Sequence, residues 1–178
     1  MFKIKYPEYV GAKTCRAKND IRYYFNAFYI DSEGLVVATD GHRMFVGPCE
    51  IVGDNPFSEF GLIVDIKGKE PNKFDYAVID TDDMSTKFYN ADDLLLTTLP
   101  ITILDARYPQ WRRVARYNEG KVSEIGFSFS YLTDAAKIGK AYGKPNNAYK
   151  IKFQDSINGA HFQFTDTAYM ILMPARVK

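Results

Sequence analysis

Residues 20–44 read DIRYYFNAFYIDSEGLVVATDGHRM, and this stretch indicates the fold more clearly than any other part of the chain. Residues 21–31 are rich in aromatic and β-branched side chains, which strands favour. Ser32, Glu33 and Gly34 then supply a turn before the apolar run 35–38. We therefore expect a β-hairpin, followed by a loop and a further extended stretch from Met44.

The residues on either side of this stretch extend the pattern. Residues 2–6 alternate apolar and basic side chains, as a strand does, and residues 7–18 carry Val10, Thr14 and Ala17 at helical spacing. Residues 44–46 are extended and end at Gly47 and Pro48. The expected order is strand, helix and three strands.

A similar order is expected near the other end of the chain. Residues 124–129 alternate, and Ser130 is a candidate cap for a helix that Gly143 and Pro145 would end. The packed face of that helix is expected to hold Leu132, Ala135, Ala136 and Gly139. Residues 148–153, 161–165 and 169–173 read as three strands.

Residue identities also link the two ends. Thr39-Asp40, Met44 and Pro48 recur as Thr165-Asp166, Met170 and Pro174, at an offset of 165 − 39 = 126. We interpret this as an internal duplication, with half-repeats at 1–56 and 118–178. Residues 57–117 between them read as further strands and a polar connector. The expected fold is α+β, with antiparallel sheets and helices on one face.

Composition narrows the classes of function. The 178 residues carry 23 Lys and Arg against 22 Asp and Glu, so the net charge of +1 favours neither nucleic acid nor membrane overall. Any DNA-binding charge must therefore be local. The two cysteines and the absence of a leader pattern favour a reducing cytoplasm. The longest apolar stretch near the end, 168–175, is too short for a membrane helix.

Three segments together resemble the bacterial DNA polymerase III beta subunit family, the beta sliding clamps. They are residues 20–44, the segment Ala106-Arg107-Tyr108-Pro109-Gln110-Trp111-Arg112-Arg113-Val114, and Met173-Pro174-Ala175-Arg176. The resemblance implies a shortened, clamp-like member, because the chain has no room for three domains and residues 67–73 leave no space for a second helix. The small size suggests a phage, prophage or mobile-element origin.

The resemblance also implies a pocket that receives short peptides from a DNA polymerase or other replication and repair factors. Its expected residues are Thr39, Gly41, His42, Arg43, Met44, Pro109, Arg113, Val114, Met173, Pro174 and Arg176. Met and Pro suit an adaptable apolar floor, while Arg and His can hold polar groups of a peptide. The residue types alone are equally compatible with strand ends and turns packed in an ordinary core.

Basic residues on the two expected helices form a second candidate surface. By resemblance, the residues expected to contact double-stranded DNA without reading its sequence are Lys13, Arg16, Lys18, Arg22, Tyr23, Tyr24, Lys137, Lys140 and Lys144. Lys137, Lys140 and Lys144 recur at helical spacing away from the apolar face. A solvated helix face, and core packing for the tyrosines, are the alternatives.

An enzyme is the less favoured interpretation. Asp40 and His42 are close in sequence, but no nucleophile, phosphate loop or metal-ligand spacing completes a site, and the pairs Asp82-Asp83 and Asp92-Asp93 suit turns. We expect no catalysis, cofactor or metal. The chain is expected to be a processivity factor, in which case several copies must form a ring, or else a non-ring decoy or adaptor for the same peptides.

Overall fold

The computed structural model describes residues 1–53, 61–143 and 149–175. Its helices are α1 (Tyr6–Cys15), the 3-10 helix η1 (Tyr23–Asn26), α2 (Trp111–Val114) and α3 (Phe129–Ala141). Its strands are β1 (Phe2–Lys5), β2 (Phe28–Ile30), β3 (Leu35–Thr39), β4 (Arg43–Pro48), β5 (Glu50–Ile51), β6 (Leu62–Ile66), β7 (Tyr76–Asp80), β8 (Ser85–Tyr89), β9 (Leu95–Ile103), β10 (Lys150–Lys152), β11 (Ala160–Gln163) and β12 (Tyr169–Leu172).

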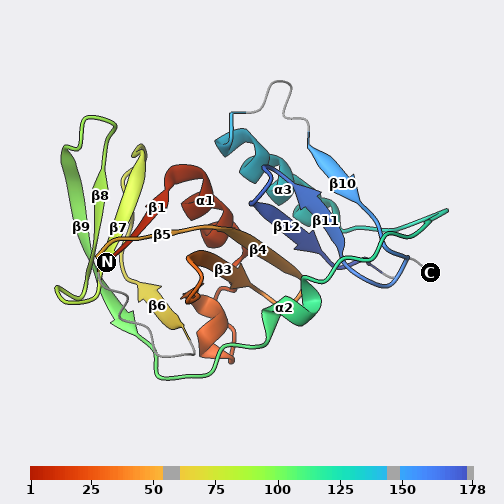
Figure 1. The fold of residues 1–178 in the computed structure, drawn as a ribbon, viewed down its shortest axis with the longest axis horizontal. Helices are drawn as coiled ribbons and strands as arrows, with labels where there is room; N and C mark the ends of the chain where they lie inside the picture. Colours follow the sequence, from red (N-terminus) through yellow and green to blue (C-terminus); the bar gives the residue numbers. More distant parts are fainter. Residues whose placement is uncertain (54–60, 144–148, 176–178) are drawn as a thin grey trace.

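Within these residues the strands form one antiparallel sheet, in the order β10-β11-β12-β4-β3-β2-β6-β9-β8-β7-β1-β5. The last strand, β12, therefore pairs with β4 from near the beginning of the chain (Figure 1). Strand β9 links the two parts of the sheet, because 95–100 pair with β8 and 101–103 pair with β6. The predicted α+β class is confirmed.

Alternation along the central strands divides the core into two layers. Val36, Phe45 and Met170 belong to a large cluster on the side of α1 and α3. Val37 and Met44 belong to a smaller cluster on the opposite side, which η1, α2 and Tyr108 cover. Successive side chains of a strand point to opposite faces, so each strand supplies both layers.

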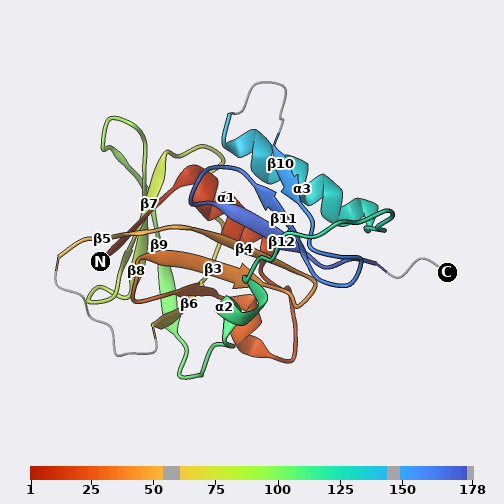
Figure 2. The ribbon, with the colours of Figure 1, turned by 45° about the vertical axis from the view of Figure 1, so that its right-hand side comes forward.

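Helices α1 and α3 lie side by side on one face of the sheet (Figures 1 and 2). Gly11 allows α1 to approach β4 closely, because a Cβ atom at position 11 would lie 2.3 Å from Cε2 of Phe45. The phenyl ring of Phe45 is fully buried beneath the helix. Gly11, which weakens a helix by its propensity, is therefore required by packing.

Residues 67–75 contain no helix, as the sequence predicts. The ring of Phe74 packs edge-on against Tyr6 and Tyr9 of α1, with centroids 5.1 and 5.2 Å apart. Glu70 forms an ion pair with Lys13 of the same helix. This short link therefore covers part of the helix layer of the sheet.

Several local predictions are wrong. Residues 124–129 form no strand, because their backbone has no ladder partner and Gly126 accepts a single bond from Ala175 N–H, at 2.8 Å. Residues 23–26 are helical rather than extended, and α2 was not expected. The N-cap of α3 is Ser128 instead of Ser130. On α3, Ala136 is exposed and Ile138 is buried.

The offset of 126 does not survive as a residue correspondence. Met44 lies in the smaller core cluster and Met170 in the larger one, so the two methionines point to opposite faces of the sheet. A shift of one residue reverses the face of a strand. Apart from the missing strand at 124–129, the order of one helix and three strands does recur, so the half-repeats at 1–56 and 118–178 stay a prediction.

No helix in the described ranges is long and apolar enough to cross a membrane.

Candidate functional site

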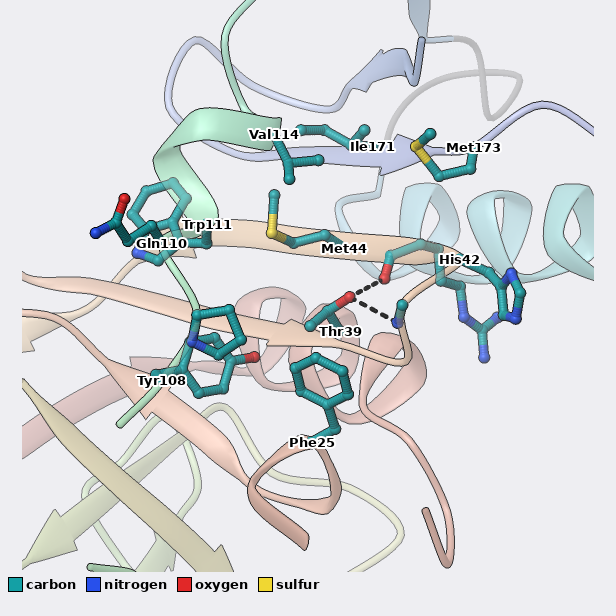
Figure 3. A pocket seen from close by; sticks show the side chains of 13 residues that line it. Phe25, Thr39, His42, Met44, Tyr108, Gln110, Trp111, Val114, Ile171 and Met173 are labelled. Atoms are coloured by element: carbon teal, nitrogen blue, oxygen red, sulfur yellow. Dashed lines mark hydrogen bonds between the residues drawn. The ribbon is translucent and has the colours of Figure 1, made fainter. Parts of the chain in front are cut away.

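The loop between β3 and β4 is held by its own short polar side chains. Thr39 Oγ1 accepts a hydrogen bond from Gly41 N–H at 3.0 Å and donates to the Arg43 carbonyl at 2.7 Å (Figure 3). Asp40 Oδ1 accepts from the N–H groups of His42 and Arg43, at 2.8 and 2.9 Å. Gly41 has a φ of +91°, which disfavours residues with a Cβ atom. The loop is therefore pre-organised.

Arg43 connects this loop to α3. Its Nε lies 3.2 Å from Asp40 Oδ2, its Nη1 pairs with Asp134, and its guanidinium lies 4.8 Å from the ring centroid of Tyr131. The side chain is 12% exposed. Arg43 therefore links the β3–β4 loop to α3 at the edge of the site.

Residues 108–114 supply a second wall. The ring of Tyr108 stacks on that of Tyr29 with centroids 4.5 Å apart and planes 3° apart. Tyr108 and Trp111 are both buried, whereas Val114 on α2 is 53% exposed. Burial raises the pKa of the Tyr108 hydroxyl, so it stays protonated. This wall is a rigid aromatic base with an exposed aliphatic rim.

Strand β12 supplies the third wall. Ile171 pairs with Met44 in the β4–β12 ladder, and both side chains face the same side of the sheet. Beyond the ladder, Met173 N–H donates to the His42 carbonyl at 2.9 Å. The end of β12 is thereby fixed beside the β3–β4 loop.

The three walls enclose a largely apolar cavity of about 260 Å³ (Figure 3). Its lining residues are Phe25, Thr39, Gly41, His42, Arg43, Met44, Tyr108, Pro109, Gln110, Trp111, Val114, Ile171 and Met173. The structure thus brings together eight of the predicted pocket residues: Thr39, Gly41, His42, Arg43, Met44, Pro109, Val114 and Met173.

The remaining predicted residues lie elsewhere. Arg113 faces an adjacent groove, Pro174 does not line the cavity, and Arg176 lies outside the described residues. Sequence reasoning missed Phe25, Tyr108, Gln110, Trp111 and Ile171 as lining residues. Four of these lie within the resembling segments, and Ile171 is the cross-strand partner of Met44, which strand register alone reveals.

The two long helices carry an exposed basic strip on the other side of the sheet. Lys137 and Lys140 are exposed on α3, as predicted, and Lys144 lies outside the described residues. Lys13 of α1 and Lys137 line the same shallow depression. Burial lowers the pKa of Lys13, with further contributions from Arg16, Lys137, Lys18 and Lys69. Positive charge is therefore concentrated here, although Glu70 neutralises part of it.

Other predicted DNA-contacting residues have internal partners. Arg16 donates to the Asn26 carbonyl at 3.2 Å and lies 4.0 Å from Asp65, whereas Lys18 is exposed. The guanidinium of Arg22 is held by both carboxylate oxygens of Asp20, at 3.0 and 2.7 Å.

Arg22 and its neighbours lie near the cavity. A Cβ atom at Gly41 would be 3.5 Å from Arg22 Nη2, and the ring of Tyr24 packs edge-on against Phe25. Tyr23, next along the chain, donates its hydroxyl to the Asp105 carbonyl at 3.3 Å. Arg22, Tyr23 and Tyr24 therefore belong to the cavity side of the sheet rather than to the helix strip.

Asp40 and His42 are not arranged as an acid–base pair. The Asp40 carboxylate is occupied by backbone N–H groups and by Arg43, and the His42 ring lies beside Tyr131, with centroids 6.1 Å apart. No group of three or more His, Cys, Asp or Glu residues that could hold a metal occurs in the described part of the chain.

Comparisons with known proteins match this architecture. No protein-family model matches the chain. The chain is 29% identical over 118 residues to the beta sliding clamp of Vibrio cholerae, across 62% of this chain and 31% of that protein. The chain therefore spans about a third of the length of this relative.

Solved structures give a fuller match. The DNA polymerase sliding clamp of Pseudomonas aeruginosa superposes with a TM-score of 0.61 at 17% identity, over 98% of this chain and 66% of that one. The Bacillus subtilis clamp gives 0.63 at 13% identity, over 99% and 64%. The Caulobacter crescentus clamp gives 0.64 at 14% identity, over 99% and 65%. The chain has the sliding-clamp fold, and the resemblance that the three motifs indicate is confirmed.

Proposed function

We propose that this protein is a clamp-like DNA replication factor that works by binding, and that its cavity receives a short hydrophobic peptide of a polymerase or repair factor. The supporting observation is the cavity itself, whose walls come from all three segments that resemble sliding clamps. Segments far apart in the sequence converge on one opening.

The chemistry of the walls suits a peptide. Met44, Ile171 and Met173 form an apolar floor that can adapt to aliphatic or aromatic side chains, and Val114 offers an exposed rim. Because hydrogen bonds already hold the β3–β4 loop and ring stacking holds Tyr108, we expect little ordering on binding. We expect micromolar affinity, as is usual for short motifs in open grooves.

A titration with a labelled peptide that carries the hydrophobic clamp-binding motif of bacterial polymerases tests this proposal. Val114→Glu places a charge at the rim of the cavity and should weaken binding at least about tenfold, while the exposed position leaves folding intact. The matched control is Ile157→Glu, since Ile157 is an exposed apolar residue outside the cavity. Equal affinities for the two variants would contradict the pocket assignment.

Met44 is a poorer position for the same test. Its side chain is only 4% exposed and contributes to the smaller core cluster, so a charge there would also unfold the sheet. Met173, which is half-buried at the end of β12, is the better second position.

The helix strip supports a second element of the proposal, a weak and sequence-independent contact with duplex DNA. Lys137 and Lys140 have the exposure that a phosphate contact requires. The strip and the cavity lie on opposite faces of the sheet. A peptide and a duplex can therefore be bound at the same time, which is what a scaffold holding an enzyme near DNA needs.

A non-ring adaptor or decoy for the same peptides is the second candidate, because the chain covers only about two thirds of each solved clamp. A processivity factor must therefore assemble into a closed ring, whereas an adaptor need not. Mass measurement in solution, with and without circular DNA, distinguishes the two: a monomer in both conditions leaves the adaptor.

A further inference from the structure

A second hollow, of about 450 Å³, lies against the same 108–111 segment as the cavity. Its distinguishing feature is arginine, since Arg107, Arg112, Arg113 and Arg116 all line it. We call it the arginine groove. Sequence reasoning placed Arg113 in the apolar cavity, whereas the structure places its side chain here.

The arginines of the groove differ in whether an acidic residue pairs with them. Arg112 pairs with the buried Asp31 and lies 2.8 Å from Glu33, and its guanidinium lies 4.4 Å from the ring centroid of Trp111. Both carboxylates are therefore already engaged. Arg113 and Arg116 are exposed and form no ion pair or side-chain hydrogen bond with any residue in the described ranges. The groove carries excess positive charge.

The arginine groove and the cavity are adjacent, and one short ridge forms a wall of both. Tyr108, Pro109, Gln110 and Trp111 line both hollows. Pro109 and Gln110 are exposed and form the crest, while the two aromatic residues are buried beneath them. An extended peptide advances about 3.3 Å per residue, so a peptide crossing this crest reaches both hollows within a few residues.

We infer that the arginine groove receives an acidic side chain of the same peptide whose apolar side chain fills the cavity. The partner is then a segment in which a hydrophobic anchor lies within a few residues of Asp or Glu. This inference rests on the proposed peptide-binding function. Arginine suits the role, because its planar guanidinium binds a carboxylate through two parallel hydrogen bonds.

The structure favours a peptide over a nucleic acid in this groove. Single strands are usually held by exposed aromatic rings on which bases stack. Tyr29, Tyr108 and Trp111, the aromatic residues of the groove, are all less than 10% exposed. The groove also lies on the face of the sheet opposite the lysine strip of the helices.

Two short peptides with the same hydrophobic core test the inference, one flanked by two Glu residues and the other by two Gln residues. Fluorescence anisotropy should give about tenfold tighter binding of the Glu peptide at low salt, and the preference should shrink at high salt. Arg113→Gln with Arg116→Gln should bring the two affinities together. The control, Lys150→Gln with Lys152→Gln on β10, removes equal charge elsewhere and should keep the preference.

The outcomes separate the inference from the proposed function. If neither peptide binds, both fail. If both peptides bind equally and Val114→Glu weakens both, the cavity stands and the acidic contact is refuted. Persistence of the preference in the double arginine variant also refutes it. Displacement of the Glu peptide by single-stranded DNA, lost in the double arginine variant, would make the groove a nucleic-acid site instead.

Discussion

Replacement of Gly11 by alanine should destabilise the protein, although alanine is the better helix former. In the interior of a helix, Gly→Ala ordinarily stabilises by about 1 kcal/mol. Here the new methyl group would lie 2.3 to 2.5 Å from three ring carbons of Phe45, against an ordinary separation of about 3.5–4.0 Å. The helix or the ring must therefore move by about 1 Å or more.

The expected size of the effect follows from these opposing contributions. Overpacking a fully buried site costs about 1–3 kcal/mol, and the gain in helix propensity offsets up to about 1 kcal/mol of that. We expect a net loss of about 1–2 kcal/mol in the free energy of unfolding. For a chain of 178 residues this corresponds to a fall in Tm of about 2–8 °C.

Urea unfolding followed by circular dichroism measures this loss. Gly139→Ala on α3 is the matched control, because its Cβ would lie 3.2 Å from the half-buried Tyr149 ring, which can yield. That variant should be neutral or stabilised by up to about 1 kcal/mol.

A double variant, Gly11→Ala with Phe45→Leu, should be less destabilised than the sum of the single variants, since leucine frees the space. If Gly11→Ala is stabilised as much as an ordinary helical glycine, the close contact of α1 with β4 is refuted. Because Phe45 alternates with Met44 on β4, a displaced ring should also weaken peptide binding in the cavity.

Three further outcomes are expected. Lys137→Ala with Lys140→Ala should reduce the steepness of log K for DNA binding against log salt concentration by about 1.8, and peptide affinity should be unchanged. An unaltered slope would exclude these two lysines from the DNA contact. Burial raises the pKa of Glu8, so its carboxyl group keeps a proton to a higher pH in the native state than in the unfolded state. The free energy of unfolding should therefore fall as the pH rises from the unfolded pKa to the native pKa. Thermal melts of Glu8→Gln should lack that fall. Burial lowers the pKa of His161, so the imidazole takes up a proton at a higher pH in the unfolded chain than in the native one, and the free energy of unfolding should fall as the pH drops below about 6.5. His161→Phe should remove this dependence. An unchanged pH profile in that variant contradicts the assignment of the pH dependence to His161.

The strands of the first half were predictable because their side chains alternate and glycine or proline ends them. Strands Leu35–Thr39 and Arg43–Pro48 contain the predicted stretches 35–38 and 44–46. Residues 23–26 were not, because hydrogen bonds between residues six positions apart bend the chain there. Asp20 and Asn26 exchange hydrogen bonds of 3.0 and 2.9 Å between side-chain and backbone atoms, which competes with an extended ladder.

The candidate site was also predictable only in part, because it depends on which strands pair and on the direction of α2. Residues that come from the resembling segments converge as expected, whereas the position of Arg113 depends on which way α2 turns. Alternation identifies a strand but not its partner, so Ile171 was not recognised as a neighbour of Met44. Residues 124–129 alternate like a strand, yet without a neighbour to pair with they form none.

Pairing of Met44 with Ile171 closes a loop of 171 − 44 = 127 residues, which bears on how the protein folds. Contacts between α1 and its neighbouring strands are local, whereas the cavity exists only after β12 has inserted between β4 and β11. Folding rates fall as the sequence separation of the required contacts grows. In a refolding experiment, competence to bind peptide should therefore appear with the slowest phase, after most helical signal has returned, and the cavity marks the final step of assembly.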